Sequence, residues 1–299
     1  MSVNYLSQNT VDAPITLASL TLDPFANTRD SRFYFDAAGH QAALLKFQAM
    51  LEDSNQGWGA LIAAPGLGKT LLRTVLHRSL DPYRFLTISI ENSLLGFDEL
   101  LLEIISQMGG ERVYANDYPD RYSRLSAFKL LLTEHVVQTD RHLVVLIDEA
   151  HGLDKQTLEY LRNLSNICAE QNNLMSIILM GGSRLGTTLR GLPELAQRIA
   201  VSMALQPLDA EQTIAYIKHR LAVAGCHQAL PLSAQNLDRL HQVSRGNPRE
   251  TNTILKRAMS IGEQAGSGLC DASISQALDE LRTTGTHQNN DFQSPGMSG

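Results

Sequence analysis

One short loop constrains the fold of this chain more than any other part of the sequence. It reads Pro65-Gly66-Leu67-Gly68-Lys69-Thr70, after an apolar stretch that we expect to be a strand (60–64), and it leads into an expected helix (69–80). A Gly-rich turn between a strand and a helix, ending in Lys and Thr, is typical of loops that bind phosphate groups. Ala63 occupies the first Gly position of that pattern, which alanine tolerates where φ is negative. The alternative interpretation is an ordinary Gly-rich turn that happens to contain Gly-Lys-Thr.

The loop assigns chemistry to its own residues. Backbone N–H groups from Gly66 to Thr70, at the N-terminus of the expected helix, would surround phosphate oxygens. Lys69 would reach the β- and γ-phosphates, and the Thr70 hydroxyl would bind Mg²⁺. We therefore expect ATP and Mg²⁺ as ligands, with a nucleotide-binding set of Pro65, Gly66, Leu67, Gly68, Lys69, Thr70 and Leu71.

A second motif follows the apolar segment 143–147, which is typical of a buried strand in a parallel sheet. Asp148 and Glu149 come directly after it, and carboxylates at the carboxyl end of such a strand face the ligand crevice. We expect Asp148 to hold Mg²⁺ and Glu149 to polarise the attacking water. The alternative is a solvated acidic turn. His151 completes the letters of a helicase motif, but no other helicase motif surrounds it, so a turn or interface role is favoured over a catalytic one.

Strand and helix patterns alternate up to about residue 206, which predicts a parallel α/β sheet with helices on both faces. From residue 207 only helical patterns occur. We expect a nucleotide-binding core over 23–206, a small all-helical domain over 207–282, a loosely ordered arm over 1–22 and a flexible polar tail over 283–299. The strands expected in the core are 60–64, 84–90, 143–147, 176–180 and 200–205.

Composition restricts the cellular compartment and the classes of partner that we expect for this protein. Of 299 residues, 25 are Lys or Arg and 31 are Asp or Glu, and the net charge of −6 argues against coating nucleic acid or anionic lipid through bulk charge. Cys168, Cys226 and Cys270 are too dispersed for a disulfide framework or a zinc site. The aliphatic runs are far shorter than the roughly 18 residues of a membrane span, and no secretory-signal pattern is present. We expect a cytoplasmic protein without direct membrane insertion.

Several further segments carry a family resemblance. Besides the two motifs above, they are Pro24-Phe25, Phe33-Tyr34-Phe35 with His40, Tyr216-Ile217-Lys218-His219-Arg220-Leu221, Ala224-Gly225 and Gly246-Asn247-Pro248-Arg249. With these segments the chain resembles, over about residues 20–280, the AAA+ ATPases of the ExeA type, which are also called general secretion pathway protein A. That family is similar to the TniB- and TnsC-type transposition ATPases and to origin-recognition ATPases. The resemblance implies a three-layer AAA+ core, followed by a helical lid with the nucleotide between them.

The resemblance also implies roles for two arginines. Arg198 matches the arginine finger, which acts on the nucleotide of a neighbouring subunit; the alternative is a helix-end arginine in a surface pair. Arg249 matches sensor 2, a lid arginine that reaches the bound nucleotide; the alternative is a solvated arginine. At the sensor 1 position, where relatives place Asn, Gln or Thr, the chain has Gly182 and then Ser183. Either Ser183 orients the water or the segment is a plain turn, so slow hydrolysis is one expectation.

Together, Lys69, Glu149 and Arg198 form the expected catalytic set of an ATPase whose nucleotide state controls assembly into a ring or a filament. The resemblance favours the secretion and pilus-assembly class, with a membrane-bound protein partner, because many relatives continue into a membrane helix that this sequence lacks. One alternative is a transposition regulator that forms ATP-dependent filaments on duplex DNA. Five cations against one acid between Arg239 and Arg257 keep nucleic-acid binding open, although a solvated face is favoured because no aromatic residues are interleaved. Another alternative is a nucleotide-binding scaffold with little turnover.

Overall fold

The computed structural model describes residues 14–53, 57–91, 95–167 and 173–288, and the chain divides into two compact units. One unit spans residues 29–206, and the other combines the chain up to residue 28 with the chain from residue 207 onward. Residues 1–13 of the expected arm, residues 289–299 of the expected tail, and Cys168 lie outside the described residues.

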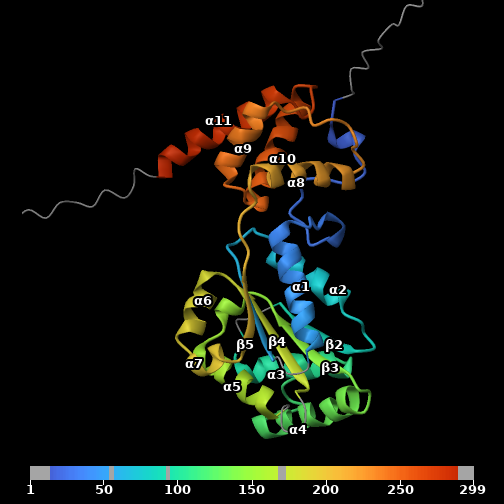
Figure 1. Cartoon of the computed structure of the whole chain (residues 1–299). Coiled ribbons are helices and arrows are strands. Elements are labelled where there is room, and N and C mark those ends of the chain that lie inside the picture. Colours follow the sequence, from blue (N-terminus) through green and yellow to red (C-terminus); the bar gives the residue numbers. More distant parts are fainter. Residues whose placement is uncertain (1–13, 54–56, 92–94, 168–172, 289–299) are drawn as a thin grey trace, which may run out of the picture. The chain divides into compact units, whose positions relative to one another are not determined.

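The unit 29–206 is built around a parallel sheet (Figure 1). Among its described residues, five strands pair in the order β2-β3-β4-β1-β5, and all neighbours run parallel. A parallel sheet gathers the carboxyl ends of β1 and β3 at one edge, on either side of β4. The strands are β1 (Trp58–Ile62), β2 (Phe85–Ile90), β3 (His142–Ile147), β4 (Met175–Gly181) and β5 (Ile199–Ala204).

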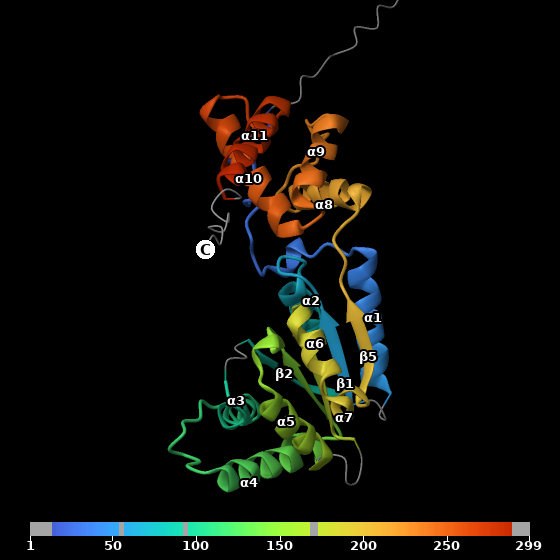
Figure 2. The same cartoon turned by 90° about the vertical axis from the view of Figure 1, so that its left-hand side faces the viewer.

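Side chains of the inner strands alternate between two apolar layers. Val144 and Leu146 of β3 face one layer, whereas Val145 and Ile147 face the other. Because both faces are covered, β3 reads in the sequence as a continuous apolar run. The first layer includes α1 (Ala38–Glu52), which lies along β1 and β5 in Figure 2, and α2 (Lys69–Ser79). The second layer includes α3 (Phe97–Gly109), α4 (Arg121–Leu132), α5 (Lys155–Ile167), α6 (Ser183–Arg190) and α7 (Pro193–Ala196).

The expected parallel α/β fold is confirmed, but α6 and α7 were not expected from the sequence. The α6 segment contains Gly186, Thr187 and Thr188, which are weak helix formers. It is helical because Leu185 and Leu189 are buried in the second apolar layer, so tertiary packing outweighs the local preference.

The second unit is helical. Asp209 starts its first helix with a capping box, in which its carboxylate accepts from the Gln212 N–H at 2.7 Å. No helix in the described part of the chain combines the length and the apolar character needed to cross a bilayer. The helices are α8 (Ala210–Val223), α9 (Ala234–Ser244), α10 (Pro248–Gln264) and α11 (Asp271–Gln288), the last of which runs past the expected end of the helical domain at residue 282.

Residues 14–28 belong to the helical unit, whereas we expected a loose arm to residue 22 and the core from residue 23 (Figure 1). Ile15 pairs with Leu269 in an antiparallel bridge, and Phe25 is buried among the helices. The guanidinium of Arg220 donates to the carbonyl oxygens of Pro24 and Ala26, 196 and 194 residues away in the sequence. Such distant partners leave no local periodicity in this segment, so its order could not be predicted from the sequence.

Candidate nucleotide site

The Gly-rich loop joins the carboxyl end of β1 to α2, and two of its glycines have backbone conformations that side-chain-bearing residues rarely adopt. Gly66 has a φ of 86° and Gly68 a φ of 89°. Gly68 is the N-cap of α2, and no described side chain caps the N-terminus of that helix. Its first N–H groups and the positive end of its dipole are therefore available to an anion. Pro65 and Leu67 lie in the same loop, and Leu71 lies in the first turn of the helix.

His40 of α1 supports the loop. Its Nε2 lies 2.8 Å from the carbonyl oxygen of Leu67, and because a carbonyl only accepts, Nε2 carries the hydrogen. Burial lowers the pKa of His40, so the ring is neutral at pH 7. A Cβ on Gly68 would lie 3.1 Å from the same nitrogen, which gives a second reason for glycine at that position. In the sequence, His40 was part of the family resemblance only, and its supporting contact becomes visible in the structure.

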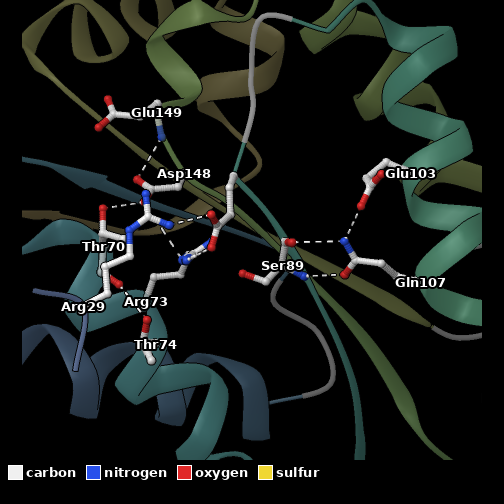
Figure 3. Close-up of polar contacts among 10 residues, drawn as sticks. Arg29, Thr70, Arg73, Thr74, Ser89, Glu103, Gln107, Asp148 and Glu149 are labelled. Atoms are coloured by element: carbon white, nitrogen blue, oxygen red, sulfur yellow. Dashed lines mark hydrogen bonds and ion pairs between the residues drawn. The ribbon is translucent and has the colours of Figure 1, made fainter. Parts of the chain in front are cut away.

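Lys69 and Thr70 extend from the first turn of α2 toward the ends of the strands. The Lys69 side chain is buried, and its Nζ donates to the Ala63 carbonyl at 3.2 Å. The Thr70 hydroxyl donates to Asp148 Oδ2 at 2.7 Å. The structure thus brings together the phosphate loop and the acidic motif, as Figure 3 shows.

The acidic pair at the end of β3 has a fixed backbone. The Asp148 N–H donates to the carbonyl of Ile90 at the end of β2, and the Asp148 side chain is 4% exposed. Glu149 has a left-handed backbone, with φ 51° and ψ 29°, and its N–H donates to Asp148 Oδ1 at 2.9 Å. A left-handed glutamate is uncommon and marks a functional or strained turn. The Glu149 carboxylate is 51% exposed, so a water molecule can reach it.

The donor atoms at this edge fit a magnesium ion that is shared with a nucleotide. Mg²⁺ in such sites takes one or two protein oxygens and completes its octahedron with phosphate oxygens and water. Thr70 Oγ1 and Asp148 Oδ2 are adjacent oxygens of this kind. Among the described residues, no group of three or more His, Cys, Asp or Glu side chains could hold a metal ion by itself. The residues therefore suit a joint protein–phosphate site.

A buried arginine lies beside the acidic pair, and we did not anticipate it from the sequence. Arg73 of α2 has a side chain only 5% exposed; its Nη2 lies 2.6 Å from Glu91 Oε1, and its Nε lies 3.9 Å from Asp148 Oδ2. Arg29 pairs with the other oxygen of Glu91 at 2.5 Å. Hydrogen bonds from Arg73 and then Arg29 hold the pKa of Glu91 below its usual value. Figure 3 shows the two arginines of this row of charges, Arg73 and Arg29, near Asp148.

Two signals in the sequence could have revealed this row. Arg73 shares the buried face of α2 with Lys69, Leu72 and Leu76, and a buried arginine calls for an acidic partner. Glu91 follows β2 in the same way that Asp148 follows β3, and the two strands are neighbours in the sheet. The rule that located Asp148 at a strand end applies equally to Glu91.

Arg198 lies at the other end of the sheet. It directly precedes β5, whose first residue pairs with Trp58 at the start of β1, and its Nη2 donates to Asn166 Oδ1 of α5 at 2.5 Å. Because β5 has six residues, the strand separates its two ends by roughly 20 Å. The structure therefore does not bring Arg198 to the phosphate loop of its own chain. The side chain is exposed, which leaves it accessible to another molecule.

Arg249 lies in the helical unit, in the first turn of α10. Asn247 caps this helix by accepting from the Arg249 N–H at 3.0 Å, and Pro248 occupies its first position. The Arg249 side chain is exposed. Its expected reach to a nucleotide stays a prediction.

The basic segment between Arg239 and Arg257 is largely matched by acids. Arg239 pairs with Asp279 at 2.7 Å, Arg257 with Glu280 at 2.8 Å, and Lys256 with Asp23 at 2.9 Å. These pairs lower the positive potential that a nucleic-acid backbone would meet. They favour the solvated-face interpretation of this segment.

The segment expected at the sensor 1 position forms the turn between β4 and α6. Gly181 ends β4, Gly182 is the N-cap of α6, and Ser183 is the first residue of that helix, with an exposed side chain. The N–H of Gly182 donates to Nδ1 of His151 at 3.5 Å. The ring of His151, from the acidic motif, thus contacts this turn.

The chain is similar to known proteins in both sequence and fold. The AAA domain family matches residues 52–189. General secretion pathway protein A of Aeromonas hydrophila is 30% identical over 281 residues, which make up 90% of this chain and 49% of that protein, so the chain spans about half the length of that relative.

Among solved structures, the fold is similar to the ORC1 protein of Aeropyrum pernix in complex with DNA, with a TM-score of 0.63 and 16% identity over 85% of this chain and 69% of that one. It is also similar to the RuvB Holliday junction branch migration motor of Thermotoga maritima, with a TM-score of 0.52 and 18% identity over 81% of this chain and 70% of that one. At these identities the likeness is one of fold. Residues 52–189 of the α/β unit thus match the AAA domain family, and the chain is similar to general secretion pathway protein A along most of its own length.

Proposed function

We propose that this chain binds ATP together with Mg²⁺ and hydrolyses the terminal phosphate, and that its nucleotide state controls assembly with further copies of the chain. The hydrogen bond between Thr70 Oγ1 and Asp148 Oδ2 is the observation that carries this proposal. It joins a hydroxyl of the phosphate loop to a buried carboxylate at one edge of the sheet, next to Glu149.

Each group in the site has a proposed task. The N–H groups from Gly66 to Thr70 bind phosphate oxygens, and the Lys69 ammonium exchanges its contact with the Ala63 carbonyl for one with the phosphates. Thr70 and Asp148 hold Mg²⁺, which when bound neutralises charge on the phosphate oxygens. Glu149 accepts a proton from the attacking water as the new P–O bond forms and the bond to the bridging oxygen breaks, leaving ADP and phosphate.

Arg198 is the proposed contribution of a neighbouring copy. It is exposed and lies at the amino end of β5, a strand length away from the site of its own chain. An arginine in that place can act on the nucleotide of a second copy, whose site would then be incomplete without it. A head-to-tail contact of this kind, repeated from copy to copy, builds a ring or a filament.

The process that we propose for this assembly is secretion or pilus assembly, in the cytoplasm and with a membrane-bound protein partner. The similarity to general secretion pathway protein A supports the process. Cys226 and Cys270 are free thiols, which suits a reducing compartment. Arg249, delivered by the helical unit, is the proposed sensor of the bound nucleotide.

The test of the enzyme uses two variants and a matched control. We expect Lys69→Ala to lose ATP binding in calorimetry, because the loop then lacks its ammonium group. Glu149→Gln should still bind ATP and should lose turnover by roughly 100-fold or more, because the amide cannot accept the proton. Glu134→Gln, which changes an exposed carboxylate just after α4, should turn over like the wild type. Wild-type turnover in Glu149→Gln, or ATP binding by Lys69→Ala at wild-type affinity, would contradict the proposal.

The test of the second copy mixes two inactive variants. Arg198→Ala has an intact loop and acidic pair but no finger, whereas Glu149→Gln has a finger but no base. Mixing them should restore part of the turnover, because Glu149→Gln subunits supply Arg198 to the intact sites. As a control for the effect of mixing, Glu149→Gln is also mixed with Arg112→Ala. The Arg112→Ala variant lacks an exposed arginine of the loop between α3 and α4 and keeps Arg198. If the mixture of the two inactive variants has only the summed activity of its parts, the trans role of Arg198 is wrong.

A further inference from the structure

Glu91, directly after β2, divides its two carboxylate oxygens between two arginines of very different burial. Its Oε1 lies 2.6 Å from Nη2 of Arg73, whose side chain is 5% exposed. Its Oε2 lies 2.5 Å from Nη1 of Arg29, whose side chain is 67% exposed. Both arginines are labelled in Figure 3. The proposed reaction gives neither arginine a task.

Arg73 has donors that it does not use. Its Nε and Nη1 are buried and have no hydrogen-bond partner within the described part of the chain. The Nε lies 3.9 Å from Asp148 Oδ2, which is close enough for an ion pair but too far for a hydrogen bond. A guanidinium can bind both oxygens of one carboxylate through two parallel N–H groups, and this arrangement is stronger than a single bond. Arg73 can therefore bind the second oxygen of Glu91, which Arg29 now occupies.

The charge of Asp148 decides which arginine needs Glu91 more. Its Oδ2 accepts from the Thr70 hydroxyl at 2.7 Å, and these two oxygens are the proposed Mg²⁺ ligands. Once Asp148 binds Mg²⁺, its attraction for Arg73 is offset by the repulsion between two neighbouring cations. A buried cation is costly without a partner, whereas a largely exposed cation such as Arg29 regains water at little cost. Glu91 should then give both of its oxygens to Arg73.

Arg29 occupies a particular place in the chain. It begins the α/β unit, directly after the part of the helical unit that ends at residue 28. Just before this junction, Asn27 is held within the helical unit, because its Oδ1 accepts from Asn252 Nδ2 at 3.1 Å. Just after the junction, Glu91 holds the Arg29 side chain. A change in the partners of Glu91 consequently reaches the segment that connects the two units.

We propose that Glu91 exchanges Arg29 for a second bond from Arg73 when Asp148 holds the Mg²⁺ of a bound nucleotide. The exchange keeps the buried arginine paired and releases the exposed one, so occupancy of the site is transmitted to the connection between the units. Glu91 and Arg73 are positioning residues in this exchange and do not touch the nucleotide. The inference rests on the proposed binding of ATP together with Mg²⁺.

The first experiment uses the reciprocity of coupled equilibria. If bound Mg²⁺ and nucleotide weaken the pair between Arg29 and Glu91, then removal of that pair must favour their binding by the same factor. We expect Arg29→Ala to lower the Mg²⁺ concentration for half-maximal binding of a non-hydrolysable ATP analogue by about two- to four-fold in calorimetry. Loss of a contact that only supports the fold would not increase affinity. An unchanged or higher Mg²⁺ requirement in Arg29→Ala overturns the inference.

The second experiment separates the exchange from a general effect of charge. Arg73→Lys keeps the positive charge but cannot bind both oxygens of Glu91 at once. In this background, Arg29→Ala should leave the Mg²⁺ requirement nearly unchanged, whereas a general charge effect would lower it as much as in the wild type. Arg32→Ala, which removes an exposed arginine paired with Asp30, is the matched control and should bind like the wild type. Equal effects of Arg29→Ala in both backgrounds overturn the exchange.

The third experiment observes the exchange in the wild-type protein, so it does not depend on how a substitution folds. NMR of protein labelled with carbon-13 and nitrogen-15 in arginine follows the rotation of each guanidinium about its Nε–Cζ bond, and the Arg29→Lys spectrum identifies the Arg29 signals. Adding the analogue with Mg²⁺ should free the rotation of Arg29, whereas adding it in EDTA should not. Binding of the analogue with Mg²⁺ but without a change at Arg29 overturns the exchange alone. Failure of the analogue to bind overturns the proposed function and the exchange together.

Discussion

The hydroxyl of Thr70 and the Oδ2 of Asp148 are 2.7 Å apart, although 78 residues separate them in the sequence. This contact locks the start of α2 to the end of β3, so the two motifs that the sequence identifies separately share one hydrogen bond. The hydroxyl also fixes which oxygen of Asp148 is next to the phosphate loop. The other oxygen, Oδ1, accepts from the Glu149 N–H.

Replacing Thr70 should change the magnesium requirement more than the binding of the nucleotide itself. We expect Thr70→Ala to raise the Mg²⁺ concentration for half-maximal ATPase activity by roughly 10-fold or more, because a proposed ligand and its orienting hydrogen bond are lost together. Thr70→Ser keeps the hydroxyl and should stay near the wild type. The check is a Mg²⁺ titration of turnover, paired with calorimetry of ATP binding in EDTA. Equal Mg²⁺ requirements for alanine and serine would show that the hydroxyl is not a ligand.

The pair between Arg73 and Glu91 should be strongly coupled in folding stability. Arg73 is 5% exposed and relies on Glu91 and Asp148 for charge compensation. Replacing Glu91 with Gln should therefore cost about 2 kcal/mol in urea unfolding, because it weakens a hydrogen bond to a buried charge. In an Arg73→Met background the same change should cost much less. Arg29→Ala, which removes a largely exposed cation, should cost under about 1 kcal/mol. A loss that is the same with and without Arg73 would refute the coupling.

Arg220 should hold residues 14–28 on the helical unit. Its guanidinium is buried and donates to the carbonyl oxygens of Pro24 and Ala26. We expect Arg220→Met to lower the free energy of unfolding by about 2 kcal/mol and to expose the segment to limited proteolysis. Arg257→Met, which breaks a half-exposed pair with Glu280, should cost under about 1 kcal/mol and leave the cleavage pattern unchanged. Identical cleavage of both variants would contradict the anchoring role.

Folding stability should fall as the pH drops from about 6.5 to about 4, in part because of His142. This residue begins β3, its Nε2 lies 2.8 Å from Ser176 Oγ, and burial lowers its pKa from 6.5 to about 4. The unfolded chain then takes up a proton at higher pH than the folded one, so the contribution of His142 is complete above pH 6.5 and lost toward pH 4.

The full shift corresponds to at most roughly 3 kcal/mol. Urea unfolding of the wild type and of His142→Asn at pH 7 and pH 4.5 measures it, and the variant should show the shallower dependence. His40 also has a pKa lowered by burial and adds a loss of the same sign in both proteins. The control is His227→Asn, which changes an exposed histidine and should show the wild-type pH dependence. The prediction is wrong if His142→Asn also shows the wild-type pH dependence.

The parts of the molecule that the sequence predicted are those whose signals are contiguous. The phosphate loop is indicated by a strand pattern, two glycines and a helix pattern within one short stretch of sequence. The burial of β3 is indicated by the unbroken aliphatic run before Asp148. Five strands were expected with ends displaced by one or two residues, because each is bounded by polar or turn-forming residues.

The parts that escaped prediction depend on contacts across the fold. From the sequence alone, Arg73 cannot be told from an exposed cation of an amphipathic helix. Its special environment is defined by Glu91 and Asp148, which only the fold brings beside it. His151 stands next to the acidic pair in the sequence, yet its contact with Gly182 requires β3 and β4 to be neighbours. Residues 14–28 show no period because their order comes from α8, α10 and the segment around Leu269.

A helical unit that combines residues 14–28 with the helices after residue 207 is completed late in synthesis. Synthesis runs from the amino end, so the α/β unit is whole before α8 has emerged from the ribosome. Ile15 and Phe25 leave the ribosome before the α/β unit, but the helices that bury them are synthesised after it. The AAA domain can therefore fold while the apolar side chains of residues 14–28 are still exposed.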